Sequence, residues 1–278
     1  MQYAPTGAEI VFINYHVSMP IIWFKAIILA IVQGITEILP ISSSGHLAFL
    51  HELLDFQLES NLLFDIALHV GTALALLFLF LPKFKKFWQD KSLWLKVIIG
   101  IFPAAIIGFL IEDYAERLND NLLVIALALI GGALLFFLVE HFFKPKQDDL
   151  KEISNQDAFW VGLWQVLSFI PGVSRSGITI VAGLGRGMSR RLAAEFSFLL
   201  AIPLILGMGL KKILDFSQGN FNLSSNELGI FMVSMSISGI IAYFSAKYLL
   251  KFLEKHSLQF FAWYRILLGV IIILLSVL

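Results

Sequence analysis

The chain has 278 residues, of which 58% are hydrophobic and only 14% are Asp, Glu, Lys or Arg. A soluble domain averages about 25% charged residues, so this composition excludes an ordinary water-soluble enzyme, a disordered protein and a nucleic-acid-binding protein. Basic and acidic residues number 20 each, so net charge indicates no partner, and the absence of cysteine excludes disulfides, thiolate nucleophiles and cysteine-bound metals. A mean hydropathy of +0.84 predicts a membrane protein with several spans.

Six apolar stretches are long enough to cross a bilayer as helices, which takes about 17–25 residues. They cover residues 62–81, 93–111, 122–142, 192–210, 228–250 and 260–278. Inside lipid each backbone N–H and C=O must find its partner within its own segment, which favours helices. We therefore expect an all-α integral membrane fold, preceded by a lead-in over residues 1–20 that lies on the surface.

Two further apolar segments, residues 22–55 and 157–190, are interrupted at their centres by polar and helix-disfavouring residues. The first interruption runs from Gln33 to His46, and the second from Pro171 to Thr179. We expect each segment to form a re-entrant hairpin of two half-helices. Irregular backbone at membrane depth is tolerated only where it is buried in protein or lines a wet cavity, so the interruptions predict a small polar chamber.

The two interrupted segments match each other at an offset of 132 residues. The identical pairs are Gln33 with Gln165, Ser42 with Ser174, Ser44 with Ser176, and Gly45 with Gly177. Three spans follow each segment, and a unit with an odd number of crossings is inverted in the membrane when it is duplicated. We therefore predict a single membrane domain over residues 21–278, made of two inverted repeats at about 21–142 and 157–278. The alternative is a chance similarity between two turns rich in serine and glycine.

The charges support a single orientation. If both hairpins are re-entrant, loops 82–92, 143–156, 186–191 and 251–259 lie on one side and carry twelve lysines and arginines. The positive-inside rule makes that side cytoplasmic. The first hairpin then enters from outside and the second from the cytoplasm, and we expect their tips to meet near the midplane.

Ionisable groups at this depth are costly, so they indicate function by default. Gln33 and Glu37 are four residues apart and share one helix face. A carboxylate with a neutral oxygen ligand suits Mg²⁺ or Ca²⁺. The first tip therefore predicts a divalent-cation site at these two residues.

The second feature of the tips is a predicted anion site. After each break a new half-helix begins, and its free N–H groups attract a negative ligand. Gly45 and Gly177 permit positive φ angles and a close approach of backbone N–H groups, while Arg175 adds a planar fork for phosphate. The predicted diphosphate-binding residues are Ser42, Ser44, Gly45, Ser174, Arg175, Ser176, Gly177 and Thr179.

The first tip also carries a candidate nucleophile, Ser43, and an acid–base candidate, His46. With Glu37 and Arg175 they form the predicted catalytic set, and together with the anion and metal sites they indicate phosphoryl transfer. The alternatives are a plain helix cap at the serines, a structural bridge from Arg175 to Glu37, and a packing role for His46. Whether Ser43, His46 or a water molecule attacks is left open.

Another pair of ionisable residues lies outside the tips. Asp65 and His69 are four residues apart on the first predicted span, where they favour a hydrogen-bonded pair facing the bundle over a metal site.

The segments Gln33-Gly-Ile-Thr-Glu37-Ile-Leu-Pro-Ile-Ser-Ser-Ser-Gly-His46 and Pro171-Gly-Val-Ser-Arg-Ser-Gly-Ile-Thr179 resemble the two signature motifs of the bacterial undecaprenyl-diphosphatase family, the bacitracin-resistance type. The resemblance extends from about Trp23 to the C-terminus. It implies hydrolysis of undecaprenyl diphosphate to undecaprenyl phosphate and inorganic phosphate, which recycles the lipid carrier for peptidoglycan synthesis. It also implies a divalent cation and an active site that opens to the periplasmic side of the bacterial inner membrane.

The family's motif residues fall on particular positions here. Its (Glu/Gln)-x-x-x-Glu element falls on Gln33 and Glu37, and its serine and histidine fall on Ser43 and His46. The glutamine at the first position weakens any model in which two carboxylates hold the metal. The Ser-Gly-His of type 2 phosphatidic acid phosphatases is also present, but their Ser-Arg-x5-His element fails because Val181 stands at the histidine position.

A carrier or flippase for an anionic lipid is the alternative function, because inverted repeats with broken helices are a transporter architecture. Such a carrier leaves the nucleophile and the acid–base group without a role. Membrane lipid is an expected partner and nucleic acid is not. The sequence leaves the oligomeric state open, with a homodimer as one candidate.

Overall fold

The computed structural model describes residues 19–58, 60–87, 90–118, 121–217 and 223–277. In these ranges the chain forms α1 (Met19–Thr36), α2 (Ser43–Leu54), α3 (Asn61–Phe87), α4 (Lys91–Leu118), α5 (Leu122–His141), α6 (Asn155–Gln165), η1 (Val166–Phe169), α7 (Arg175–Gly185), α8 (Arg190–Ser217), α9 (Ser225–Leu253) and α10 (Gln259–Val277). The all-α fold class is therefore confirmed. Most of the lead-in expected for residues 1–20 lies outside the described residues.

Seven of these helices are long and apolar enough to cross a membrane, namely α1, α3, α4, α5, α8, α9 and α10. Six of them match the predicted spans. The seventh, α1, was not predicted as a span, because the first broken segment was expected to hold two half-helices only. Its 18 residues form one continuous helix, in which Lys25 and Gln33 are the polar residues that precede Thr36. The chain is a multi-pass membrane protein.

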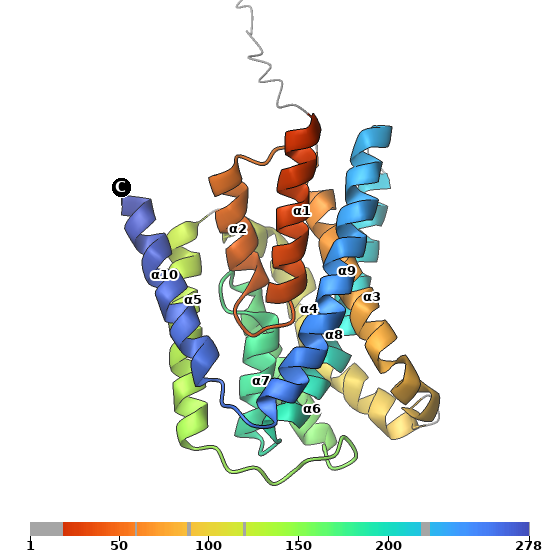
Figure 1. Ribbon diagram of the computed structural model, residues 1–278. Coiled ribbons are helices and arrows are strands. Elements are labelled where there is room, and N and C mark those ends of the chain that lie inside the picture. Colours follow the sequence, from red (N-terminus) through yellow and green to blue (C-terminus); the bar gives the residue numbers. More distant parts are fainter. Residues whose placement is uncertain (1–18, 59, 88–89, 119–120, 218–222, 278) are drawn as a thin grey trace, which may run out of the picture.

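The helices that flank the two breaks form two pairs in the bundle. In Figure 1, α1 and α2 lie in one half of the molecule and α6 and α7 in the other, and the loops that join each pair meet between the halves. Direct contacts hold the two loops together. The hydroxyl of Ser176 donates to the carbonyl oxygen of Leu39 at 3.3 Å, and the backbone N–H of Gly172 donates to Ser44 at 3.5 Å. The tips of the two broken segments therefore meet, as the sequence predicts.

The basic connections gather at one end of the bundle. The segment after α5, the turn between α7 and α8 and the turn between α9 and α10 all lie there, and α3 ends and α4 begins at the same end (Figure 1). Some of these cations are paired with buried acids. Arg186 binds Asp157 at 2.7 Å, and Arg190 binds Glu140. These basic connections therefore share one end of the bundle, and the assignment of that end to the cytoplasm stays a prediction.

Glycine allows two long helices to cross closely. A Cβ atom added at Gly71 of α3 would stand 2.2 Å from the carbonyl oxygen of Met235 in α9, and one at Gly239 would stand 2.9 Å from the carbonyl oxygen of Gly71. At the same crossing Ser238 donates to the carbonyl oxygen of Leu68 at 3.0 Å. Small residues that let backbones approach are the usual basis of helix packing in lipid, where apolar surface gains little by meeting apolar surface.

We predict that Gly71→Ala lowers the stability of the bundle by about 1–3 kcal/mol, because the new methyl group collides with backbone that cannot turn aside. The matched control is Gly207→Ala in α8, where an added Cβ has no atom within 4 Å. Thermal unfolding in detergent, followed by tryptophan fluorescence, measures both. Equal melting temperatures for the two variants would contradict this account of the crossing.

Candidate active site

The loop between α1 and α2 and the loop before α7 have the same local structure. Ser42 and Ser174 have positive φ angles of 72° and 74°, which non-glycine residues rarely adopt. Each serine caps the helix that follows it: Ser42 accepts from the backbone N–H of Gly45 at 3.3 Å, and Ser174 accepts from that of Gly177 at 3.1 Å. Strained backbone of this kind costs about 1–3 kcal/mol and tends to occur at functional sites.

The two glycines differ from the prediction in their backbone conformation, while their contact with a ligand stays a prediction. Gly45 and Gly177 lie in the first turns of α2 and α7 and have no positive φ, and their N–H groups are already bound by the capping serines. The expectation of positive φ at these residues is therefore wrong. The missing side chain serves packing instead, since a Cβ at Gly177 would stand 3.0 Å from Phe136 and 3.2 Å from Arg265.

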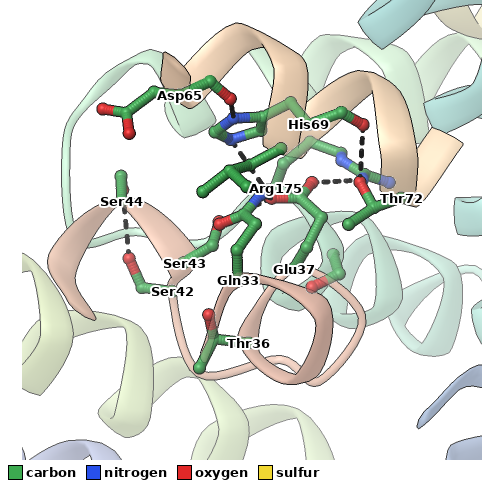
Figure 2. A network of polar contacts seen from close by, with 12 residues as sticks. Gln33, Thr36, Glu37, Ser42, Ser43, Ser44, Asp65, His69, Thr72 and Arg175 are labelled. Carbon is green, nitrogen blue, oxygen red and sulfur yellow. Dashed lines mark hydrogen bonds and ion pairs between the residues drawn. The ribbon is translucent and has the colours of Figure 1, made fainter. Parts of the chain in front are cut away.

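The centre of the site is the carboxylate of Glu37, which lies just after α1 and is 7% exposed. Its Oε2 accepts from the hydroxyl of Ser43 at 2.6 Å and from Nε2 of Gln33 at 3.2 Å, and it lies 3.4 Å from Nε2 of His69. Its Oε1 accepts from a guanidinium nitrogen of Arg175 at 2.8 Å. Figure 2 shows these side chains converging from α1, α2, α3 and α7. The structure thus brings together three predicted catalytic residues and both predicted metal ligands.

The structural bridge that the sequence left as an alternative is present, because the partly buried Arg175 and the buried Glu37 form an ion pair between residues 138 positions apart. A second nitrogen of the Arg175 guanidinium donates to the carbonyl oxygen of Ser197 in α8 at 3.2 Å. A guanidinium has five N–H donors, and these contacts with the described residues use two of them. The bridge is therefore compatible with a role of Arg175 in binding an anion.

His46 points away from this cluster. Its Nδ1 lies 2.7 Å from the carbonyl oxygen of Ser42, its Nε2 lies 2.7 Å from the hydroxyl of Tyr264, and its ring stacks on that of Tyr264. A carbonyl oxygen can only accept, so Nδ1 carries a proton and Nε2 of the neutral ring accepts from the tyrosine. Both nitrogens are engaged within the protein, which matches the packing alternative. A catalytic role for His46 stays a prediction.

The other predicted binding residues use their hydroxyls to hold the loops. Ser176 binds the carbonyl oxygen of Leu39, and Ser44 binds the backbone of the second loop. Thr179 is 1% exposed and donates to the hydroxyl of Ser197 in α8 at 2.7 Å. These contacts define the shape of the site, while direct contact of these residues with a ligand stays a prediction.

A cavity of about 870 Å³ adjoins the Glu37 cluster. Its lining is largely apolar and comes from α2, α3, α4, η1 and α8, with Ser44, His51, Asp65 and His69 as polar groups on one wall. His69 connects the two regions, because it lines the cavity and its Nε2 lies beside Glu37. His69 therefore links the Glu37 cluster to a largely apolar chamber that also has polar groups on its wall.

Sequence reasoning did not place His69 in the site. The expected hydrogen bond within the Asp65–His69 pair exists, but it joins Nδ1 of His69 to the backbone carbonyl oxygen of Asp65 at 2.8 Å. The Asp65 carboxylate instead binds His51 at 3.0 Å. His69 could have been found from the sequence, because an ionisable residue within a predicted span indicates function by default. The same signal applies to Arg265 of α10.

The residues present fit a cation that arrives with a phosphate ligand better than one held by protein alone. Among the described residues, no group of three or more His, Asp or Glu side chains is placed to hold a metal ion. However, Oε1 of Gln33 is buried without a hydrogen-bond partner beside the Glu37 carboxylate. Mg²⁺ is often bound by one or two carboxylates together with substrate phosphates, and an orphaned amide oxygen next to a carboxylate suits that arrangement.

Comparison with known proteins decides the family. The family model for the bacitracin resistance protein BacA matches residues 26–271, which include both loops and the whole Glu37 cluster. The chain belongs to this family. The resemblance seen in the two motifs of the BacA family is therefore confirmed.

Several curated proteins are similar to this BacA-family chain over nearly their full lengths. It is 38% identical to undecaprenyl-diphosphatase 1 of Oenococcus oeni, with 91% of this chain and 96% of that protein covered. It is 38% identical to the undecaprenyl-diphosphatase of Lactobacillus delbrueckii subsp. bulgaricus and 39% identical to undecaprenyl-diphosphatase 3 of Acinetobacter baylyi, with 90% of this chain and 96% of each protein covered.

We predict that Arg175→Met lowers the stability by about 3–5 kcal/mol, because it leaves the Glu37 carboxylate buried without its counter-ion. The double variant Glu37→Gln/Arg175→Met is expected to recover a large part of this loss, since neither charge then remains. Melting temperatures in detergent test the coupling, with the exposed Lys255→Met as a control for the loss of one cation. Strictly additive losses would contradict an energetic coupling of the pair.

Proposed function

We propose that this chain is an undecaprenyl-diphosphatase, which hydrolyses undecaprenyl diphosphate to undecaprenyl phosphate and inorganic phosphate. The observation that carries the proposal is the hydrogen bond of 2.6 Å from the Ser43 hydroxyl to the buried Glu37 carboxylate, with Arg175 bound to the same carboxylate. Similar proteins are named for this reaction. The reaction recycles the lipid carrier of peptidoglycan synthesis and accounts for the bacitracin resistance in the family name.

The geometry favours Ser43 as the nucleophile. Glu37 accepts the Ser43 proton while Oγ attacks the terminal phosphorus, and the bond to the bridging oxygen breaks to release undecaprenyl phosphate. Water then attacks the phosphoserine, inorganic phosphate leaves, and the proton returns to Ser43. Arg175 stabilises the charge on the transferred phosphoryl group, as cationic clamps do in phosphoryl transfer. His46 is less suited to attack, because both ring nitrogens are already bound.

The Glu37 carboxylate and the amide oxygen of Gln33 would hold the divalent cation, Mg²⁺ or Ca²⁺. When bound, that cation supplies positive charge that neutralises the diphosphate oxygens. The Gln33 side chain keeps the carboxylate in position through its hydrogen bond at 3.2 Å. Phosphate oxygens of the ligand would complete the coordination of the cation, because the described residues offer one carboxylate whose two oxygens already have protein partners.

We also infer that the chain consists of two inverted repeats with re-entrant hairpins. The order of elements repeats, with α1 and α2 before the long helices α3 to α5, and with α6, η1 and α7 before the long helices α8 to α10. The two loops also share positive φ at Ser42 and Ser174. The basic end of the bundle is assigned to the cytoplasm by the positive-inside rule. The cavity, whose lining includes Asn61 and Lys212 toward the other end, then opens to the periplasmic side of the bacterial inner membrane.

We predict that Ser43→Ala lowers phosphate release from undecaprenyl diphosphate at least about a thousandfold, because the attacking group is lost. His46→Ala should retain clearly more activity than Ser43→Ala. Ser236→Ala, which removes an exposed hydroxyl on α9, is the control and should match the unaltered chain. A complete loss in His46→Ala with activity retained in Ser43→Ala would contradict serine attack. Binding of the lipid without turnover by the unaltered chain would instead indicate a carrier.

We expect a chelator to suppress phosphate release and added Mg²⁺ to restore it. Gln33→Glu should lower the Mg²⁺ concentration needed for half-maximal activity about tenfold, because a second carboxylate strengthens binding of a hard cation. A Mg²⁺ titration of both forms after chelation measures the effect. A rate that chelation leaves unchanged would rule out the metal assignment to Glu37.

A further inference from the structure

One arginine is wholly buried where the last helix meets the two loops. Arg265 of α10 has no exposed surface, and among the described residues no carboxylate pairs with it. Its guanidinium lies over the ring of Phe136 at 5.1 Å and donates to backbone carbonyl oxygens. A buried guanidinium without a counter-ion is costly unless hydrogen bonds satisfy it, so these carbonyl contacts are what stabilises it in this position.

The carbonyl oxygens come from three separate segments. Two belong to α5, at Leu129 and Ala128. The third is Pro40 in the first loop at 3.3 Å, and the fourth is Gly172 in the second loop at 3.0 Å. Pro40 lies between Glu37 and Ser43 in the chain, and Gly172 lies three residues before Arg175. One side chain therefore joins the backbones of both loops that carry the proposed chemistry.

Two glycines make room for this guanidinium. A Cβ atom added at Gly132 of α5 would stand 2.0 Å from one Arg265 nitrogen, and one at Gly177 would stand 3.2 Å from another. The neighbouring Gly131 has open space, with no atom within 4 Å of an added Cβ. The pocket for Arg265 is therefore shaped by a specific residue whose neighbour offers a matched control.

We propose that Arg265 is a positioning residue, whose guanidinium holds the two loops in register so that Ser43, Glu37 and Arg175 face one diphosphate. Its catalytic consequence rests on the proposed function, whereas its effect on the loops does not. A lysine keeps the charge but offers one compact group in place of a planar fork with five donors, so it cannot reach oxygens on three segments at once. Arg265 touches neither substrate nor reacting atoms in this role.

The first experiment measures the loops directly. The chain has no cysteine, so nitroxide labels can be attached only at Ile35→Cys and Ile170→Cys, two exposed positions beside the loops. Pulsed electron paramagnetic resonance gives the distance distribution between them. In this background we expect Gly132→Ala, which displaces the guanidinium, to broaden or shift the distribution, and Gly131→Ala to leave it unchanged.

The second experiment measures catalysis. A misplacement of about 1 Å can cost about a hundredfold in rate, so we expect Arg265→Met to lower kcat by about that factor with a smaller change in KM, and Arg265→Lys to recover part of it. The control is Lys96→Met, because Lys96 is also buried and donates to the carbonyl oxygens of Leu150 and Lys151, away from the loops. Its loss should leave kcat per folded molecule unchanged.

A double variant separates positioning from a general loss of structure. If Arg265 acts by aligning Arg175, then Arg265→Met should cost little further in an Arg175→Lys background, whereas a lower folded fraction reduces the rate of every variant by the same factor. Equal reductions in all backgrounds with unchanged label distances would overturn the proposal. So would identical distances and rates for Gly132→Ala and Gly131→Ala. Failure of the unaltered chain to release phosphate would refute the proposed function, and the label distances would still decide the role of Arg265.

Discussion

The ion pair between Glu37 and Arg175 is the interaction on which the arrangement of the site depends. The carboxylate alone would be strongly unfavourable there, because it is buried and little water can solvate it. The two charges come from loops far apart in the sequence, and their attraction requires those loops to meet. Once they meet, the hydroxyl of Ser43 lies against the same carboxylate. The contact that stabilises the bundle is therefore also the contact that assembles the site.

Most other polar groups near the loops serve to hold this contact in place. Ser176 and Ser44 tie the two loops to each other, and Arg265 ties both of them to α5 through carbonyl oxygens. Ser42 and Ser174 have strained, positive φ angles, and each caps the helix that begins directly after the break. We expect a site held by so many backbone contacts to be preorganised, which favours electrostatic stabilisation of a transition state.

The cavity beside the site has both polar and apolar lining residues. Polar groups of α2 and α3 form one wall, where His69 borders the Glu37 cluster, and Ser168, Lys211 and Lys212 add polar groups elsewhere to a lining that is otherwise largely apolar. A diphosphate lipid has the same division between a charged head and an apolar chain. The match supports the proposed function, because the head group can leave water there while its chain remains in an apolar setting.

The sequence by itself determined the membrane class, the all-α fold and the family, because long apolar runs and two matching polar interruptions are visible without coordinates. It also predicted that Gln33, Glu37, Ser43 and Arg175 belong to one site, and these four side chains meet in the structure. It did not predict that α1 continues for 18 residues, since local composition does not specify where a helix ends. Only the tertiary structure decided that His69 rather than His46 lies beside Glu37 and that Arg265 reaches both loops. Those contacts depend on how helices distant in the chain are turned against one another, and that rotation is set by packing across the whole bundle.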